Sequence, residues 1–168
     1  METKFIIVRT LWLFCIVSIC LLHTPGQAHS QIKPVRFEHL DSLLTIQKRG
    51  IVVFIHTSWC KFCHRFQETT LKSARVQKLL NNEFYFVDLD AECKTDIVFR
   101  NHTFRYDPVH RLHDLARELG TKNDQVSYPT ITFLNTNFKI LHQQDGYISE
   151  KNLLPVLEKL ARQNSIEN

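Results

Sequence analysis

The chain has little glycine, proline and methionine. Its 168 residues include four Gly, five Pro and one Met, which is the first residue. The scarcity of Gly and Pro excludes a collagen-like chain, and an apolar content of 43% excludes a disordered one. A chain of this length builds one core more readily than two. We therefore expect a single globular domain.

Charge of one sign is not concentrated in any part of the sequence. The chain carries 21 Lys and Arg against 17 Asp and Glu, and the two signs are interspersed. A protein that binds nucleic acid would show clustered Lys and Arg, whereas interspersed charges are typical of an ordinary solvated surface. We expect no nucleic-acid partner.

The N-terminal segment has a composition of its own. Lys4 and Arg9 precede an apolar run over 11–22, and the small residue Ala28 comes shortly after it. This layout predicts a secretory signal peptide over 1–30, followed by the domain over 31–168. The run is short for a membrane span, although counting back to Phe5 leaves an uncleaved anchor open. We expect a location outside the cytoplasm, with membrane contact only through an uncleaved segment.

Cysteines are too few for a scaffold held together by disulfides. Cys15 and Cys20 lie in the predicted signal peptide, which leaves Cys60, Cys63 and Cys93 in the domain. Three is an odd number, and small disulfide-rich domains carry more cysteines in pairs. The sequence therefore indicates one close pair and a single thiol, and we interpret Cys93 as a half-buried structural residue.

Apolar periodicity predicts helices and strands in alternation. The unbroken β-branched and aromatic run 51–55 is typical of a central strand that is covered on both faces. Gly50 and Gly120 are expected to follow the C-terminal ends of helices, and Pro155 implies either a cap at Asn152 or a kink. The expected helices are 37–49, 60–80 with a break near Ser73, 109–119 and 149–162; the expected strands are 51–55, 84–89, 97–100, 103–106, 130–134 and 138–142.

The pair Cys60-Lys61-Phe62-Cys63 directly follows the central strand and opens a helix. Unpaired backbone N–H groups at a helix N-terminus stabilise a thiolate, which is the form that attacks a disulfide. A second thiol one helical turn later can displace the resulting mixed disulfide. This placement predicts that Cys60 is the nucleophile and Cys63 the resolving thiol, with Trp59 and Phe62 as an apolar lip.

With these residues in place, the sequence resembles the thioredoxin superfamily over about 35–162. The resemblance rests on the strand that leads into Trp59-Cys60-Lys61-Phe62-Cys63 and on Tyr128-Pro129-Thr130 ahead of a later strand. It implies an α/β thioredoxin fold, with a central mixed β-sheet flanked by helices. It also implies that Pro129 is cis and lies against the cysteine pair, where Trp59, Tyr128, Pro129 and Thr130 would contact a client chain.

The closest likeness is to exported bacterial thioredoxin-like proteins, which implies a periplasmic or otherwise extracytoplasmic thiol-disulfide oxidoreductase. Its partners would be the thiols or disulfides of client proteins and a further redox protein, and it would need no cofactor or metal. The segment 93–108 is extra to the minimal fold. Reductase, oxidase and isomerase activities are all compatible with the Lys61-Phe62 dipeptide.

One position departs from the thioredoxin pattern. Cytosolic thioredoxins place a buried acid six residues before the first cysteine, and here that residue is Phe54. Glu68 or Asp88 could substitute for it, although we interpret both as surface or strand-end acids. The missing acid favours an alternative in which the fold is a redox-idle module that binds clients.

A second alternative is a c-type haem protein, because Cys60 to His64 also matches the Cys-x-x-Cys-His attachment motif. Residues 31–168 contain no Met, so another His would have to be the second axial ligand. His64 is otherwise a solvated helix residue or a modest electrostatic aid to the Cys60 thiolate. His102, His110 and His113 do not follow a zinc-site spacing with Cys93, so we expect no metal site.

Overall fold

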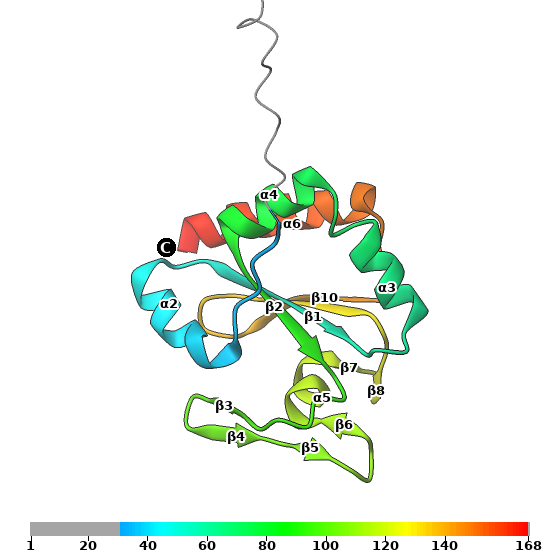
Figure 1. Cartoon of the computed structure of the whole chain (residues 1–168). Coiled ribbons are helices and arrows are strands. Elements are labelled where there is room, and N and C mark those ends of the chain that lie inside the picture. The colour runs from blue at the N-terminus through cyan, green and yellow to red at the C-terminus, as the bar shows by residue number, and fades with distance from the viewer. Residues whose placement is uncertain (1–30, 168) are drawn as a thin grey trace, which may run out of the picture.

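A four-stranded sheet lies between two layers of helices in the computed structural model, which describes residues 31–167 (Figure 1). The strand order is β10-β9-β1-β2, with β1 parallel to β2 and antiparallel to β9, and with β10 antiparallel to β9. The expected central mixed sheet flanked by helices is thereby confirmed. The strands are β1 (Gly50–His56), β2 (Phe84–Asp90), β9 (Thr130–Leu134) and β10 (Ile140–Asp145).

Alternating side chains of β1 enter two separate cores. Val52 and Phe54 pack on the face covered by α3 (Lys61–Glu68), α4 (Ala74–Glu83) and α6 (Glu150–Glu167). Ile51, Val53 and Ile55 pack on the face covered by η1 (Phe37–His39), α2 (Leu40–Ile46) and α5 (Asp114–Gly120). Because successive side chains of a strand point to opposite faces, a run that is apolar throughout needs cover on both. The prediction of a buried central strand is confirmed.

The helical region after Cys60 breaks where expected. Ser73 is the N-cap of α4, and its hydroxyl accepts a hydrogen bond from the Val76 N–H at 3.4 Å. In α6 the alternative with Asn152 as cap is wrong, since the helix begins at Glu150 and the N–H groups of Asn152 and Leu153 both bond to the Ser149 carbonyl. Pro155 lies inside the helix.

The expected helix 37–49 is shorter than its periodicity suggests. Helix α2 ends at Ile46, the backbone at Gln47 is already extended, and Gly50 is the first residue of β1. A Cβ there would lie 2.1 Å from Asn164 Nδ2 and 3.0 Å from the Phe84 ring, so any larger residue would displace these side chains. Gly50 therefore does not close a helix, and the prediction for it is wrong.

The expected helix 109–119 also begins too early. Residues 106–113 form the short strands β5 (Tyr106–Asp107) and β6 (Leu112–His113), and α5 starts at Asp114. Gly120 is the last residue of α5, and a Cβ there would lie 3.1 Å from Val126 Cγ1 and 3.2 Å from Ile55 Cδ1. This glycine therefore permits close packing against β1.

Two predicted hairpins have their turns or strands at other residues than expected, and a third hairpin was not predicted. The hairpin of β3 (Ile97–Phe99) and β4 (His102–Phe104) is confirmed, but its turn is Arg100-Asn101, where both φ angles are positive, as in a type I′ turn. The loop after β9 covers residues 135–139 and is longer than predicted, so β10 spans 140–145 and not 138–142. The hairpin of β7 (Thr121–Lys122) and β8 (Gln125–Val126) was not predicted.

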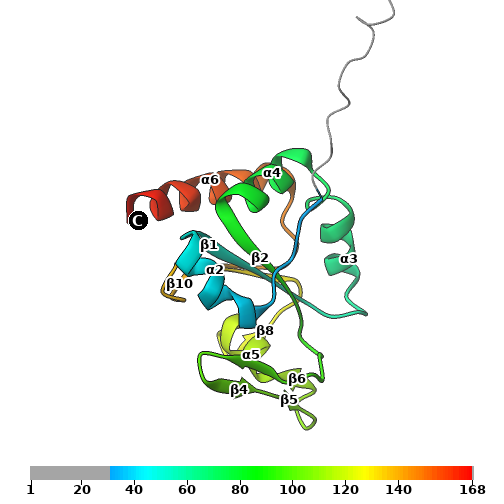
Figure 2. The same cartoon turned by 60° about the vertical axis from the view of Figure 1, so that its left-hand side comes forward.

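The predicted insertion 93–108 is part of a longer connection between β2 and α5, residues 91–113, which is called the inserted segment below. It lies beneath the sheet, on the opposite side from α4 and α6 (Figure 1 and Figure 2). None of the helices within residues 31–167 has the length and apolar character to cross a membrane. The predicted signal peptide over 1–30 falls outside the described residues.

Candidate active site

Cys60 and Cys63 are joined in a disulfide at the start of α3, with their Cα atoms 5.2 Å apart. Strand β1 ends at His56, and the carbonyl of Thr57 accepts a hydrogen bond from the Cys60 N–H at 3.3 Å as the chain turns into the helix. Cys60 is 7% exposed and Cys63 is 1% exposed. Cys60 is therefore the more exposed residue of the pair.

The Cys60 side chain is the N-cap of α3, as expected from the sequence. Its Sγ accepts a hydrogen bond from the Cys63 N–H at 3.0 Å, and the first turn of the helix holds no acidic residue. A thiolate formed at Cys60 on reduction would sit at the positive end of the helix dipole. This placement supports the predicted role of Cys60 as nucleophile.

Aromatic side chains flank the disulfide. Trp59 is 63% exposed and Phe62 is nearly as exposed, so both form an apolar lip beside Cys60. The Trp59 ring meets the Tyr128 ring edge-on at 5.8 Å, and Trp59 Nε1 donates a hydrogen bond to Glu92 Oε2 at 3.1 Å. Burial, with the charges of Glu92 and Asp90, raises the pKa of Tyr128 and keeps its hydroxyl neutral.

The Tyr128-Pro129 peptide bond is cis, as the resemblance implied. Pro129 is buried, and its carbonyl accepts a hydrogen bond from the Gly146 N–H at 2.7 Å. Thr130 is fully buried and its hydroxyl donates to the Ser127 carbonyl at 2.7 Å. A role of Pro129 and Thr130 in client binding stays a prediction, and for Thr130 the side chain is already engaged within the protein.

A groove of about 680 Å³ runs from Trp59 and Tyr128 to the inserted segment. One end is formed by Trp59 and Tyr128, and the other by the β5–β6 turn, α5 and the β7–β8 turn. Sequence analysis missed this groove, because the segment that forms its far wall was treated as an addition to the fold.

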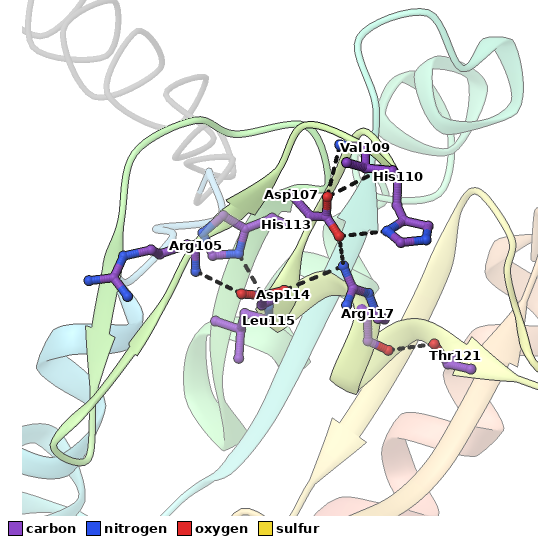
Figure 3. Close-up of polar contacts among 9 residues, drawn as sticks. All are labelled: Arg105, Asp107, Val109, His110, His113, Asp114, Leu115, Arg117 and Thr121. Atoms are coloured by element: carbon purple, nitrogen blue, oxygen red, sulfur yellow. Dashed lines mark hydrogen bonds and ion pairs between the residues drawn. The ribbon is translucent and has the colours of Figure 1, made fainter.

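A network of ion pairs shapes that far wall (Figure 3). Asp107 accepts hydrogen bonds from the N–H groups of Val109 and His110, and its second oxygen contacts His110 Nδ1 at 2.6 Å and Arg117 Nη2 at 3.0 Å. Arg117 also pairs with Asp114 at 3.4 Å. The hydrogen bond from His110, together with those from the backbone, holds the pKa of Asp107 far below its ordinary value.

Of the two acids that could replace the missing carboxylate, Glu68 is exposed and paired with Lys72, in agreement with its interpretation as a surface acid. Phe54 itself is fully buried and packs against Phe66. Asp88 contacts His56, with Oδ1 and Nε2 2.5 Å apart. His56 was missed, although strand alternation places it on the same face as Phe54, and parallel pairing with β2 brings Asp88 near it.

The remaining thiol of the described residues has no disulfide partner. Cys93 is half-buried, as expected, and its Sγ lies 3.9 Å from the Thr95 carbonyl. Between residues 31 and 167, no three His, Cys, Asp or Glu side chains are grouped so that they could hold a metal ion. His64 is exposed on the outer side of α3.

Comparisons with known proteins agree with this fold. The family profile described as "Thioredoxin-like domain" matches residues 38–161. A thioredoxin from Thermus thermophilus is similar in structure, with a TM-score of 0.59 and 16% identity over 80% of this chain and 90% of that one. The DsbH oxidoreductase gives a TM-score of 0.57 and 16% identity over 84% of this chain and 92% of its own.

The C-terminal domain of Neisseria meningitidis DsbD in its oxidised form is similar too, with a TM-score of 0.54 and 16% identity over 75% of this chain and 99% of that domain. At such identities the likeness establishes the fold alone. No curated protein sequence matches the chain significantly.

Proposed function

The chain belongs to the thioredoxin-like family, and we propose that it is a thiol-disulfide oxidoreductase that acts on protein disulfides outside the cytoplasm. The main support is the Cys60–Cys63 disulfide at the N-terminus of α3, with the more exposed cysteine at the cap position. Exchange through such a pair runs in either direction, and the net direction depends on its reduction potential relative to that of the compartment.

The surroundings of the disulfide fit a polypeptide client. Trp59 and Tyr128 give an aromatic surface beside Cys60, and the groove continues from them to the inserted segment. The clients would be proteins with accessible thiols or disulfides, and a further redox protein would restore the pair after each cycle. The alternative as a c-type haem protein is less well supported, because the family match over residues 38–161 is to a thioredoxin-like domain.

The experiment that tests this function is a trap for the mixed disulfide. Replacing Cys63→Ser should leave Cys60 able to attack a client disulfide but unable to complete the exchange, so that Cys60–client adducts accumulate. Cys93→Ala should be added, because this half-buried thiol could form adducts of its own. Non-reducing gels of the exported fraction, followed by mass spectrometry, would show the adducts.

The matched control adds Cys60→Ser, which should abolish every adduct. If the trap captures nothing and the wild-type protein also fails to reduce a model peptide disulfide and to oxidise a model peptide dithiol, the protein is a redox-idle binding module. Location is tested separately by N-terminal sequencing of the exported form, which should begin near His29 or Gln31. Recovery of a full-length chain with Met1 in the membrane fraction would instead indicate an anchored domain.

A further inference from the structure

The groove beside Trp59 is lined by five charged or titratable side chains, and three of them are already engaged within the protein. Glu92 accepts a hydrogen bond from the Trp59 indole N–H. His110 and Arg117 both contact Asp107. These three side chains therefore shape the groove and are held by their partners.

The other two charged side chains of the groove, those of Arg111 and Asp124, are not engaged. Arg111 lies in the β5–β6 turn and Asp124 in the β7–β8 turn, so they come from two different hairpins at the far end of the groove. Both residues are exposed, and neither side chain forms a hydrogen bond or an ion pair within the described part of the chain. The groove therefore offers one cation and one anion of its own to a bound molecule.

The backbone that carries Arg111 is fixed. Its φ of 53° lies in the left-handed region, which Gly and Asn adopt more readily than Arg. Asp107 holds the same turn by accepting hydrogen bonds from the N–H groups of Val109 and His110. Backbone preference therefore does not account for an arginine here, and such positions are frequent where a side chain serves binding. A turn that is already ordered also loses less entropy when it binds a partner.

The apolar residues of the groove suit an extended polypeptide. Leu112 and Val126 line its far part, and Trp59 and Tyr128 form the end that adjoins Cys60 in the sequence. A volume of about 680 Å³ lies within the usual range of binding pockets, about 300–1,000 Å³, and accommodates a few residues. A client chain whose disulfide reaches Cys60 can thus continue over Trp59 into the groove.

On the basis of the oxidoreductase function proposed above, we propose that this groove selects client chains by charge. An extended client segment next to the reactive cysteine lies in the groove, with an acidic side chain paired to Arg111 and a basic side chain near Asp124. A guanidinium can bind a carboxylate through two parallel hydrogen bonds. Successive side chains of an extended segment point to opposite sides, so neighbouring client residues can reach the two hairpins at once. Arg111 and Asp124 are specificity residues, and the exchange itself stays at Cys60.

The expected effect is modest and depends on salt. A pair between solvent-accessible charges is weak, so a correctly placed acidic residue should speed the reaction about 3-fold to 5-fold at low ionic strength. Charges at the edge of an interface act mainly on the rate of association, and dissolved ions screen them. The preference should therefore shrink as salt is added.

The test measures how fast the reduced protein attacks defined peptide disulfides. Protein carrying Cys93→Ala is mixed with symmetrical disulfides of single-cysteine peptides, which carry Glu, Gln or Lys at successive positions on either side of the cysteine. Acid-quenched and alkylated samples give the second-order rate constant by mass spectrometry. At the position that reaches Arg111, the Glu peptide should react about 3-fold to 5-fold faster than the Gln peptide, and about 0.5 M NaCl should remove most of the difference.

Variants assign this preference to the groove. Arg111→Gln should abolish the advantage of Glu over Gln and leave the rate with the Gln peptide unchanged, whereas Arg111→Glu should favour Lys at the same position. Asp124→Asn should reduce only the advantage of Lys at neighbouring positions. The matched control is Arg100→Gln, because Arg100 is also an exposed arginine with positive φ in a hairpin turn of the inserted segment but lies outside the groove. This control should keep the preferences of the parent.

Three outcomes would overturn the proposal for the groove alone. They are equal rates with the Glu, Gln and Lys peptides at every position, a preference for Glu that survives in Arg111→Gln, and an equal loss of that preference in Arg100→Gln. The last would show that only the net charge of the protein matters. A parent protein that reacts with none of the peptides would instead contradict the oxidoreductase function itself.

Discussion

Two shielded histidines, one in each main part of the molecule, have their pKa values shifted in opposite directions. His56 is the last residue of β1, the strand that leads to the cysteine pair, and its contact with Asp88 raises its pKa despite burial. His113 ends the inserted segment and is fully buried; burial lowers its pKa more than the charges of Asp114 and Asp96 raise it. A direct carboxylate partner therefore decides whether a shielded imidazole here gains or loses basicity.

The two regions are also held together differently. The disulfide region, here β1 and α3, rests on apolar side chains that fill the core on one face of the sheet, with Phe54 and Phe66 at its centre. The inserted segment has two-residue and three-residue strands, and its end near α5 is shaped by the ion pairs of Asp107 and Arg117. Apolar burial therefore stabilises the disulfide region, and polar contacts shape the wall of the groove.

The largest expected effect is the loss of Phe54. Phe54→Ala should lower the free energy of unfolding by about 4 kcal/mol, because it removes a fully buried ring from the core beneath α3. The matched change in the inserted segment is Val98→Ala, at an exposed position of β3, which should alter stability by no more than about 0.5 kcal/mol. Urea denaturation of both variants measures the difference, and similar losses would contradict the contrast between the regions.

A smaller effect is expected where α5 joins the two regions. Gly120→Ala should cost about 2 kcal/mol, because the added methyl group would press on Ile55 of β1 and Val126 of β8. Glu118→Ala, at an exposed position of the same helix, is the control and should be nearly neutral. Thermal and urea unfolding would both report the change. A neutral Gly120→Ala would show that the junction yields without cost.

The smallest effect concerns pH. A lowered folded-state pKa at His113 means that its contribution to stability is complete above its unfolded pKa of about 6.5 and is lost as pH falls toward the folded value. Protonation would also remove the acceptor Nδ1, which caps α5 by binding the Leu115 N–H. His113→Asn keeps a capping side chain but cannot titrate in this range.

Wild-type protein should therefore lose more stability between pH 7 and pH 5 than the His113→Asn variant does, as measured by urea midpoints. His56 acts in the opposite sense, since a raised pKa gives stability below about pH 6.5 that is lost as pH rises through the folded value. That contribution is common to both proteins and cancels in the comparison. Parallel pH profiles would show that His113 is free to protonate in the folded protein.

Local patterns predicted the features that depend on residues close together in the sequence. The run 51–55, the break at Ser73 and the placement of Cys60 at a helix start were each readable, because strand burial and helix capping depend on neighbours in sequence. The start of α5 was not. Leu112 has the spacing of a helical residue, yet it lies in β6 and pairs with Asp107 of β5. Only the folded segment shows that His113 caps the helix.

The sequence by itself determined the family, the cysteine pair and the cis proline segment, since these depend on residue types at short spacings along the chain. Tertiary structure decided what surrounds the pair. His56 and Asp88 are 32 residues apart and meet because β1 and β2 lie parallel in register. The groove beside Trp59 exists because the inserted segment folds back beneath the sheet. Contacts of this kind depend on the packing of whole elements, which no local pattern of side chains specifies.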